Sequence, residues 1–419
     1  MCFTIYTFCK KLHCLLLICV VSTLPFSIDH LQLNSFFILL LLVNSIPLII
    51  CSFKETAKKN YFWVLLFISP YLVLVAGLVR TDNSQEASFE LQKKIALVFF
   101  PVILGFTPKL NAKEIKTILF SFVISCLATS VFILLVASYK YFQFSDSNFF
   151  FYHKLSGLAG MHASYLSLYI ILSVAIILSE FSSNFRALLL KQKGVCVLAV
   201  LFFSCMIFLL SARMQIIAFM FGVFIYTIYI FAKKGQFKKS LFILMPMCVV
   251  FLLLIFLIPI NRERFKEAIN YKGRYSVDKI WGGRALRELN WDCSKKIIDD
   301  NIFFGVGTGD VQDELQKCYV ANNYYQLTYW ENTKYNAHNQ FLETTIGQGI
   351  IGLFLLLICL FAAFMNAFKY KKPLYFIFLT IFVFSCLTES MLERQHGVVL
   401  FALFNALFAF QYTGFKEGE

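Results

Sequence analysis

The chain is a succession of long apolar runs separated mostly by short polar gaps. Runs of roughly 17–23 apolar residues have the length of a helix that crosses a bilayer, and about twelve of them occur in the sequence. The pattern therefore predicts an all-α membrane protein with about twelve transmembrane helices. The predicted spans are 12–28, 34–53, 61–80, 92–107, 116–138, 159–180, 194–211, 214–232, 240–260, 345–367, 373–389 and 395–413.

One polar segment, residues 261–344, is far longer than the other gaps and is rich in Tyr, Trp and Asn. Within it, residues 284–298 place Leu286, Leu289 and Cys293 on one side of a predicted amphipathic helix. We therefore expect 261–344 to form a mostly helical cap. Residues 1–260 would carry the first nine spans, and 345–419 the last three with a short tail.

The composition and the placement of charge agree with a membrane protein. Hydrophobic residues make up 59% of the chain, charged residues 15%, and the mean hydropathy is +0.71, whereas soluble domains carry about 25% charged residues. The net charge of +14 lies largely in short gaps such as 54–60. Basic residues in alternate short gaps indicate cytoplasmic loops and argue against nucleic-acid binding. They predict cytoplasmic termini and an extracytoplasmic cap. Lys10 and Lys11 could also begin a signal peptide, but a poor cleavage site follows, so we expect a helix there.

A polar, aromatic stretch that precedes the tenth predicted span contains the candidate catalytic residue, His338. Its imidazole gains or loses a proton near neutral pH, and Tyr335 and Asn339 are close enough in sequence to fix its tautomer. A lone histidine is more often structural than catalytic, but this one is predicted to lie at the membrane surface. Gly347 and Gly349 follow, where small residues permit close backbone approach.

Three arginines are candidate ligands for an anion. Arg213 separates two apolar runs, and Arg284 and Arg287 lie three residues apart in the predicted cap helix. Guanidinium groups recognise phosphate in a bidentate manner. Structural alternatives are a helix-ending arginine for Arg213 and a solvated pair for the other two.

A second polar cluster, Glu389, Glu393 and Arg394, lies between the last two predicted spans. The alternation of loops predicts that it faces the same outer side as His338, where it would support the site. The structural alternative is a neutralising Glu393–Arg394 pair.

Cys293 and Cys318 are the two cysteines of the cap segment. A disulfide between them would stabilise the cap in an oxidising compartment, but the sequence leaves open whether their Cα atoms lie within bonding range. His338 has no His or Cys at ligand spacing, and the chain lacks a suitable Asp-x-Asp pair in the cap. We therefore expect neither a metal nor another cofactor.

Together, Ser211-Ala212-Arg213, the long segment with its arginines, and Ala337-His338-Asn339-x-Phe341-Leu342 before Gly347-x-Gly349 resemble the O-antigen ligase/O-antigen polymerase family. These are bacterial inner-membrane glycosyltransferases of the GT-C kind. The resemblance implies an undecaprenyl-pyrophosphate-linked glycan donor, lipid A–core as acceptor, and inverting transfer without metal. It also implies that Arg213 and either Arg284 or Arg287 bind the pyrophosphate, and that His338 acts on the acceptor hydroxyl.

Several alternatives stay open at this point. Within the family, a polymerase would join two lipid-linked units, and a protein-glycosylating ligase would use a protein acceptor. A transporter of lipid-linked glycans would show related halves and charges deep within several spans, whereas the charges here gather at the ends of the predicted spans.

Overall fold

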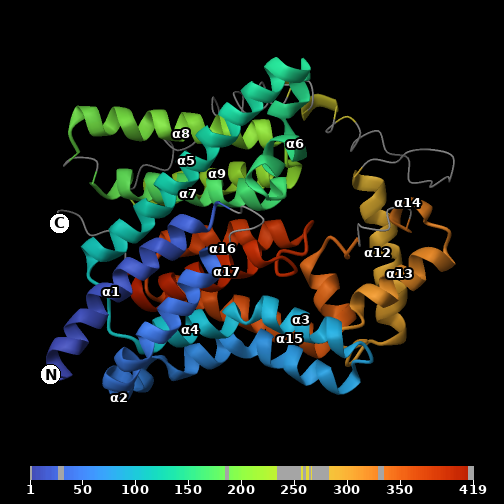
Figure 1. Cartoon of the computed structure of the whole chain (residues 1–419), viewed down its shortest axis with the longest axis horizontal. Helices are drawn as coiled ribbons and strands as arrows, with labels where there is room; N and C mark the ends of the chain where they lie inside the picture. Colours follow the sequence, from blue (N-terminus) through green and yellow to red (C-terminus); the bar gives the residue numbers. More distant parts are fainter. Residues whose placement is uncertain are drawn as a thin grey trace.

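The computed structural model describes residues 2–26, 33–184, 188–233, 256–257, 261–263, 266, 283–328 and 335–413. In these residues the chain forms helices and turns, with no β-strand. The principal helices are α1 (Cys2–Thr23), α2 (Leu33–Ala76), α3 (Ser84–Lys94), α4 (Ala96–Phe106), α5 (Ala112–Phe144), α6 (Tyr152–Ser156), α7 (Ala163–Asn184), α8 (Leu190–Leu210), α9 (Arg213–Lys233), α12 (Gly283–Asp300), α13 (Val311–Ala321), α14 (Tyr325–Thr328), α15 (Gln340–Lys369), α16 (Pro373–Cys386), α17 (Gln395–Ala406) and the π-helical turn η4 (Leu407–Gln411) (Figure 1).

Six helices of the described chain are long and apolar enough to cross a membrane, and α16 and α17 with η4 are shorter apolar helices. The chain is therefore a multi-pass membrane protein. The prediction of about twelve spans is tested only in part, because most of the predicted span 240–260 lies outside the described residues.

The structure differs from the predicted map at residues 54–60, which continue α2 instead of forming a loop between two spans. Their Lys, Glu and Ala residues favour helix, and the segment contains no Gly or Pro that would end one. Before this segment α2 packs on α1, where Asn44 donates to the carbonyl of Cys9. After it α2 meets α4 and α15, and the two portions run in different directions in Figure 1.

A phenylalanine-rich core holds the bundle together. The rings of Phe122 and Phe404 lie 4.8 Å apart between α5 and α17, and those of Phe382 and Phe401 lie 4.4 Å apart between α16 and α17. Aromatic contacts of this kind add to the dispersion energy of close packing. The segment between α16 and α17, which carries Glu389, is therefore held by two firmly packed helices.

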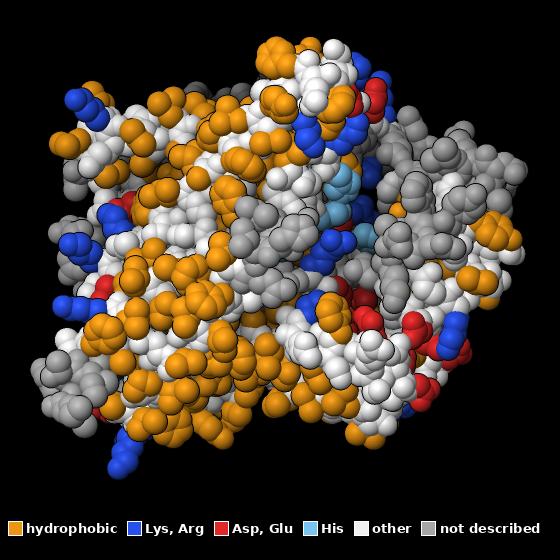
Figure 2. Space-filling model, viewed as in Figure 1, with side chains coloured by type: hydrophobic (Ala, Val, Ile, Leu, Met, Phe, Trp, Pro, Cys, Tyr) orange, Lys and Arg blue, Asp and Glu red, His pale blue; other side chains and the backbone are white. Residues whose placement is uncertain are grey.

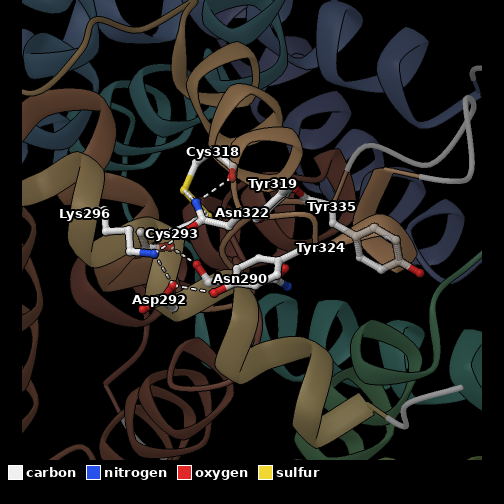
Figure 3. The surroundings of a disulfide bond; sticks show 10 residues. Asn290, Asp292, Cys293, Lys296, Cys318, Tyr319, Asn322, Tyr324 and Tyr335 are labelled. Atoms are coloured by element: carbon white, nitrogen blue, oxygen red, sulfur yellow. Dashed lines mark hydrogen bonds and ion pairs between the residues drawn. A yellow bond between two sulfur atoms is a disulfide. The ribbon is translucent and has the colours of Figure 1, made fainter. Parts of the chain in front are cut away.

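The cap helices α12, α13 and α14 pack around a small apolar core that also includes Ile346 of α15, and Figure 3 shows the disulfide of this region. Leu289, Cys293 and Ile297 of α12 are buried in it, which confirms the amphipathic face predicted for 284–298. Cys293 and Cys318 form a disulfide between α12 and α13, with their Cα atoms 5.8 Å apart. This bond and the apolar core hold α12, and with it two of the candidate arginines, in a defined position.

Backbone contacts join the cap to the start of α15. The amide of Gly307 donates to the carbonyl of Gly347 at 3.0 Å. The amide of Ile350 donates to the carbonyl of Ile302 at 2.8 Å. Gly349 has φ of +63°, and a Cβ there would lie 2.2 Å from the carbonyl oxygen of Phe303. The close approach predicted for these glycines is therefore present.

The molecule has two polar ends separated by an apolar surface (Figure 2). The cap helices lie at one end, whereas the start of α1 and the turn η4 lie toward the other (Figure 1). Figure 2 shows His side chains with Lys or Arg side chains in a hollow near the cap, and further Lys or Arg side chains along the opposite end.

Candidate active site

The turn that carries His338 is fixed by the first residues of α15. Asn339 caps this helix by accepting hydrogen bonds from the amides of Phe341 and Leu342. His338 has φ of +46°, a left-handed conformation that a non-glycine residue rarely adopts without support. Its amide donates to Oδ1 of Asn336 at 3.0 Å, which supplies part of that support.

Glu389 joins His338 to Arg287. One carboxylate oxygen lies 3.2 Å from Nδ1 of His338, and the other accepts a hydrogen bond of 3.0 Å from Nη2 of Arg287. Arg287 also donates from Nε to the carbonyl of Thr388 at 3.1 Å. Three elements thus meet at one carboxylate: the turn before α15, the helix α12, and the segment between α16 and α17.

Electrostatics keep Glu389 ionised. Burial by itself would raise the pKa of its carboxyl, but the charge and hydrogen bond of His338, with His162 and Arg287, outweigh burial and hold that pKa well below its usual range. A carboxylate on Nδ1 favours the tautomer that carries a proton on Nδ1 and leaves Nε2 as a proton acceptor.

A cavity of about 380 Å³ lies beside this group, and Arg213, Arg284 and Arg287 all line it. Arg213 begins α9 directly after Ser211, whose φ of +50° ends α8. A Cβ on Gly283 would lie 3.5 Å from Nη2 of Arg213 and 4.0 Å from Nη1 of Arg287, so the two guanidinium groups are near neighbours. Arg284 is half-exposed and pairs with Glu288 at 3.3 Å.

The other predicted supporting residues divide into two groups. Tyr335 has its ring 6.0 Å from that of His338, and Asn339 donates from Nδ2 to the carbonyl of Leu387, which ties the histidine turn to the segment with Glu389. Glu393 does not take part in this arrangement, and Arg394 is exposed at the start of α17.

The alternative in which Glu393 neutralises Arg394 is wrong. Glu393 instead accepts hydrogen bonds of 2.6 and 2.8 Å from Nζ of Lys94, a residue far away in the sequence. Lys94 also pairs with Glu90 at 3.0 Å. The physical reason is burial: a carboxylate facing the bundle needs a buried cation, and Lys94 at the end of α3 provides one.

Sequence reasoning missed two residues near this site. Glu343 accepts hydrogen bonds from the amide of Ala337 at 2.7 Å and from Oγ of Ser390 at 3.3 Å, so it fastens the histidine turn to the Glu389 segment. An acidic residue in the first turn of a membrane-entering helix was the available signal. The second is His162, just before α7, for which the sequence favours packing at a helix end over a binding role. Burial lowers the pKa of His162 to about 4, although Glu389 opposes this shift, so it is neutral at pH 7.

In the part of the chain that the structure describes, no three His, Cys, Asp or Glu side chains are grouped closely enough to hold a metal ion. Independence from metal stays a prediction, to be tested by activity.

The fold and this geometry define a class: an all-helical, multi-pass membrane protein in which a histidine, a carboxylate and several arginines meet beneath a disulfide-bonded cap. Residues 198–357 match the family model described as O-antigen ligase. This part of the chain, which is less than half of it, is similar to that family and supports the resemblance seen in the sequence. The match includes Arg213, both cap arginines and His338, and it ends before Glu389. None of the curated proteins compared with the chain matches it.

The similarity supports a role of the ligase or polymerase type for the chain.

Proposed function

We propose that the protein transfers a glycan from an undecaprenyl-pyrophosphate carrier to an acceptor hydroxyl, with lipid A–core as the acceptor. The observation that supports this most strongly is the cavity lined by Arg213, Arg284 and Arg287, with His338 attached to Arg287 through Glu389. A reaction that expels pyrophosphate and deprotonates an alcohol needs both kinds of group.

The arginines serve the leaving group. As the bond from the sugar C1 to the pyrophosphate oxygen breaks, negative charge grows on that oxygen, and fixed guanidinium groups stabilise it without reorganisation. The guanidinium groups of Arg213 and Arg287 both lie close to Gly283 and suit this role together. Arg284 is engaged with Glu288 on the exposed side, so it contributes less.

His338 serves the acceptor. With Nδ1 directed to Glu389, Nε2 accepts the hydroxyl proton while the acceptor oxygen bonds to C1 from the opposite face, which inverts the configuration. Glu389 stabilises the imidazolium that forms, in the manner of a histidine–carboxylate pair. The products are the glycosylated acceptor and undecaprenyl pyrophosphate.

In this proposal the protein lies in the bacterial inner membrane, with the cap in the periplasm and both termini in the cytoplasm. The cap lies at one end of the bundle, and the start of α1 and η4 lie toward the other (Figure 1). A donor anchored by a prenyl chain can then present its pyrophosphate at the outer surface without leaving the bilayer.

Reconstitution with a defined lipid-pyrophosphate glycan tests this proposal. Lipid A–core, a second lipid-linked unit, and a hydroxyl-bearing peptide are offered as acceptors in separate reactions. A product on lipid A–core supports ligation, whereas chains on the lipid carrier or product on the peptide would identify a polymerase or a protein-glycosylating ligase. Movement of intact donor across vesicles without any transfer would instead show a transporter.

A further inference from the structure

A second cavity, of about 1180 Å³, lies at the end of the bundle opposite the cap. It is bounded by the middle of α2, the C-terminal ends of α4 and α15, the start of α16, and η4. Its lining shares no residue with the cavity of the candidate active site. The proposed reaction therefore gives it no role.

The lining is cationic. Lys59, Lys109 and Lys372 all contribute to it, against one carboxylate, Glu55. Lys372 is only 6% exposed and donates from Nζ to the carbonyls of Phe408 and Ala409 at 2.8 and 2.7 Å. These contacts use two of the three ammonium donors and involve no carboxylate. Burial, with Lys109 nearby, lowers the pKa of Lys372 to about 7, so an anion in the cavity would restore a charge that the protein alone disfavours.

Two buried polar atoms in the lining point to a ligand independently of the lysines. Thr107 and Asn366 are each 2% exposed, and within the described residues Oγ1 of Thr107 and Oδ1 of Asn366 have no hydrogen-bond partner. Buried polar atoms are normally paired, because an unpaired buried donor or acceptor has lost its hydrogen bonds to water without replacement. A hydroxyl can donate to a phosphate oxygen, and an amide oxygen can accept from a hydroxyl. The two atoms thus suit a ligand that carries both groups.

Hydrogen bonds fix the walls of the cavity. Asn60 of α2 donates to the carbonyl of Gly105 at 2.7 Å, and Ser52 donates to that of Phe106 at 2.7 Å. Gln411 of η4 accepts from the amide of Leu110 and donates to the carbonyl of Leu104. The π-helical turn is itself a conformation found frequently at functional sites. The cavity is therefore held open by specific contacts.

The surroundings favour a lipid. Trp63 and Tyr370 belong to the lining, and aromatic residues with lysines are typical of the membrane–water interface. Ile50, next in sequence to the lining residue Cys51, and Phe368, two residues before Tyr370, are 73% and 76% exposed, as expected of lipid-facing side chains. From this geometry we propose that the cavity binds the phosphate of an anionic, hydroxyl-bearing lipid headgroup at the membrane surface opposite the cap.

The test uses purified, delipidated full-length protein in a neutral detergent and measures the Kd for phosphatidylglycerol by native mass spectrometry. Thr107→Val with Lys109→Gln removes the unpaired hydroxyl and one lining charge. Because a hydrogen bond to a charged group contributes about 1.5–3 kcal/mol, we expect the Kd to rise ~10-fold or more. Lys58→Gln, which removes an exposed charge from the same part of α2 outside the cavity lining, is the matched control and should change the Kd less than twofold.

Phosphatidylcholine and inorganic phosphate form separate arms. Selective binding of phosphatidylglycerol that depends on the two lining residues supports the lipid site. The same dependence with inorganic phosphate alone would support the phosphate site and assign it to a soluble ligand. Equal binding by wild type and the double variant, equal binding of phosphatidylcholine, or no binding at all would overturn the proposal. Should the double variant not fold, Lys109→Gln at its exposed position carries the same comparison.

Discussion

Glu389 and Glu393 lie four residues apart in the segment between α16 and α17, yet their surroundings differ. Glu389 contacts His338 and Arg287, whose side chains are 22% and 23% exposed beside the arginine-lined cavity. Glu393 contacts Lys94, whose side chain is 8% exposed and which also holds Glu90. Each carboxylate has cationic partners. Arg287 lines the cavity of about 380 Å³, whereas Lys94 and Glu393 line one of only about 30 Å³.

The comparison separates two uses of buried charge. The Lys94 group is closed on itself, so its charges stabilise the packing of α3 against the segment before α17. The His338–Glu389–Arg287 group leaves an imidazole and a guanidinium partly accessible, so its charges are available for chemistry. A low pKa of a carboxyl does not distinguish the two, because the pKa of each carboxyl lies below its usual range: burial alone would raise it, and neighbouring cations outweigh burial.

Replacement of His338 has the largest expected effect. His338→Ala removes the proposed base, and transfer should fall ~10²–10⁴-fold, the usual contribution of general base catalysis. The measurement is glycan transfer in reconstituted vesicles at equal protein levels, with the unfolding midpoint as a check on folding. Unchanged transfer by a well-folded variant would show that His338 has no catalytic role.

Paired substitutions of the two carboxylates test the comparison directly. Glu393→Gln removes one of the two carboxylates that pair with the buried Lys94. The free energy of unfolding should therefore fall by about 3–5 kcal/mol. Transfer per folded molecule should stay within about twofold of the wild type. Glu389→Gln should unfold more easily by a smaller amount, because its partners are partly solvated, and its transfer should fall at least ~10-fold. Urea unfolding and transfer assays on both variants provide the measurement. The reverse pattern would mean that the functional group has been assigned to the wrong carboxylate.

The pH dependence of stability belongs to the same pair of variants. Since the pKa of each carboxyl is lower in the folded chain, each pairing stabilises the fold above the ordinary carboxyl pKa and is lost as the pH falls below that range. Unfolding midpoints measured from pH 7 to pH 3 should therefore fall less steeply in either variant than in the wild type.

Much of this organisation can be predicted from the sequence. The spacing in 284–298 predicts α12 closely, and the break at Ser211–Arg213 separates α8 from α9 as expected. These features are local, because a helical period and a polar interruption are recorded within a few turns. The same local analysis does not predict that α2 is continuous. Hydropathy shows that residues 54–60 are polar, but it does not show that they continue the helix.

The partners of the two carboxylates could not be predicted. His338 and Glu389 are 51 residues apart, and Lys94 and Glu393 are 299 apart. No periodicity relates residues at such separations. The neighbours Glu393 and Arg394 suggest an ion pair from the sequence, but in the folded chain Glu393 pairs with Lys94 instead. Sequence reasoning therefore found the polar segments and the catalytic candidate, but not which charges meet.

The two cap arginines extend the comparison to the cavity, with smaller expected effects. Arg287→Ala removes a proposed ligand of the pyrophosphate and a partner of Glu389, so transfer should fall ~100-fold. Arg284→Ala removes a half-exposed residue already paired with Glu288, and transfer should fall less than ~10-fold. Initial rates at saturating and limiting donor give the measurement for both variants. A larger loss for Arg284→Ala would reverse the assignment of the pyrophosphate ligand.

Chelation of divalent metal has the smallest expected effect. Both Glu389 and Glu393 already have cationic side chains as partners, so neither is disposed to give up that pairing for Mg²⁺, and the arginines supply the positive charge that a leaving pyrophosphate needs. EDTA should therefore leave the initial rate of transfer unchanged, provided that ionic strength is matched. Matching is needed because screening alone weakens guanidinium–phosphate attraction. Loss of activity in EDTA that Mg²⁺ or Mn²⁺ restores would show that a metal, together with the arginines, stabilises the leaving pyrophosphate. In that case the roles of Glu389 and Glu393 would have to be reassigned with the metal included.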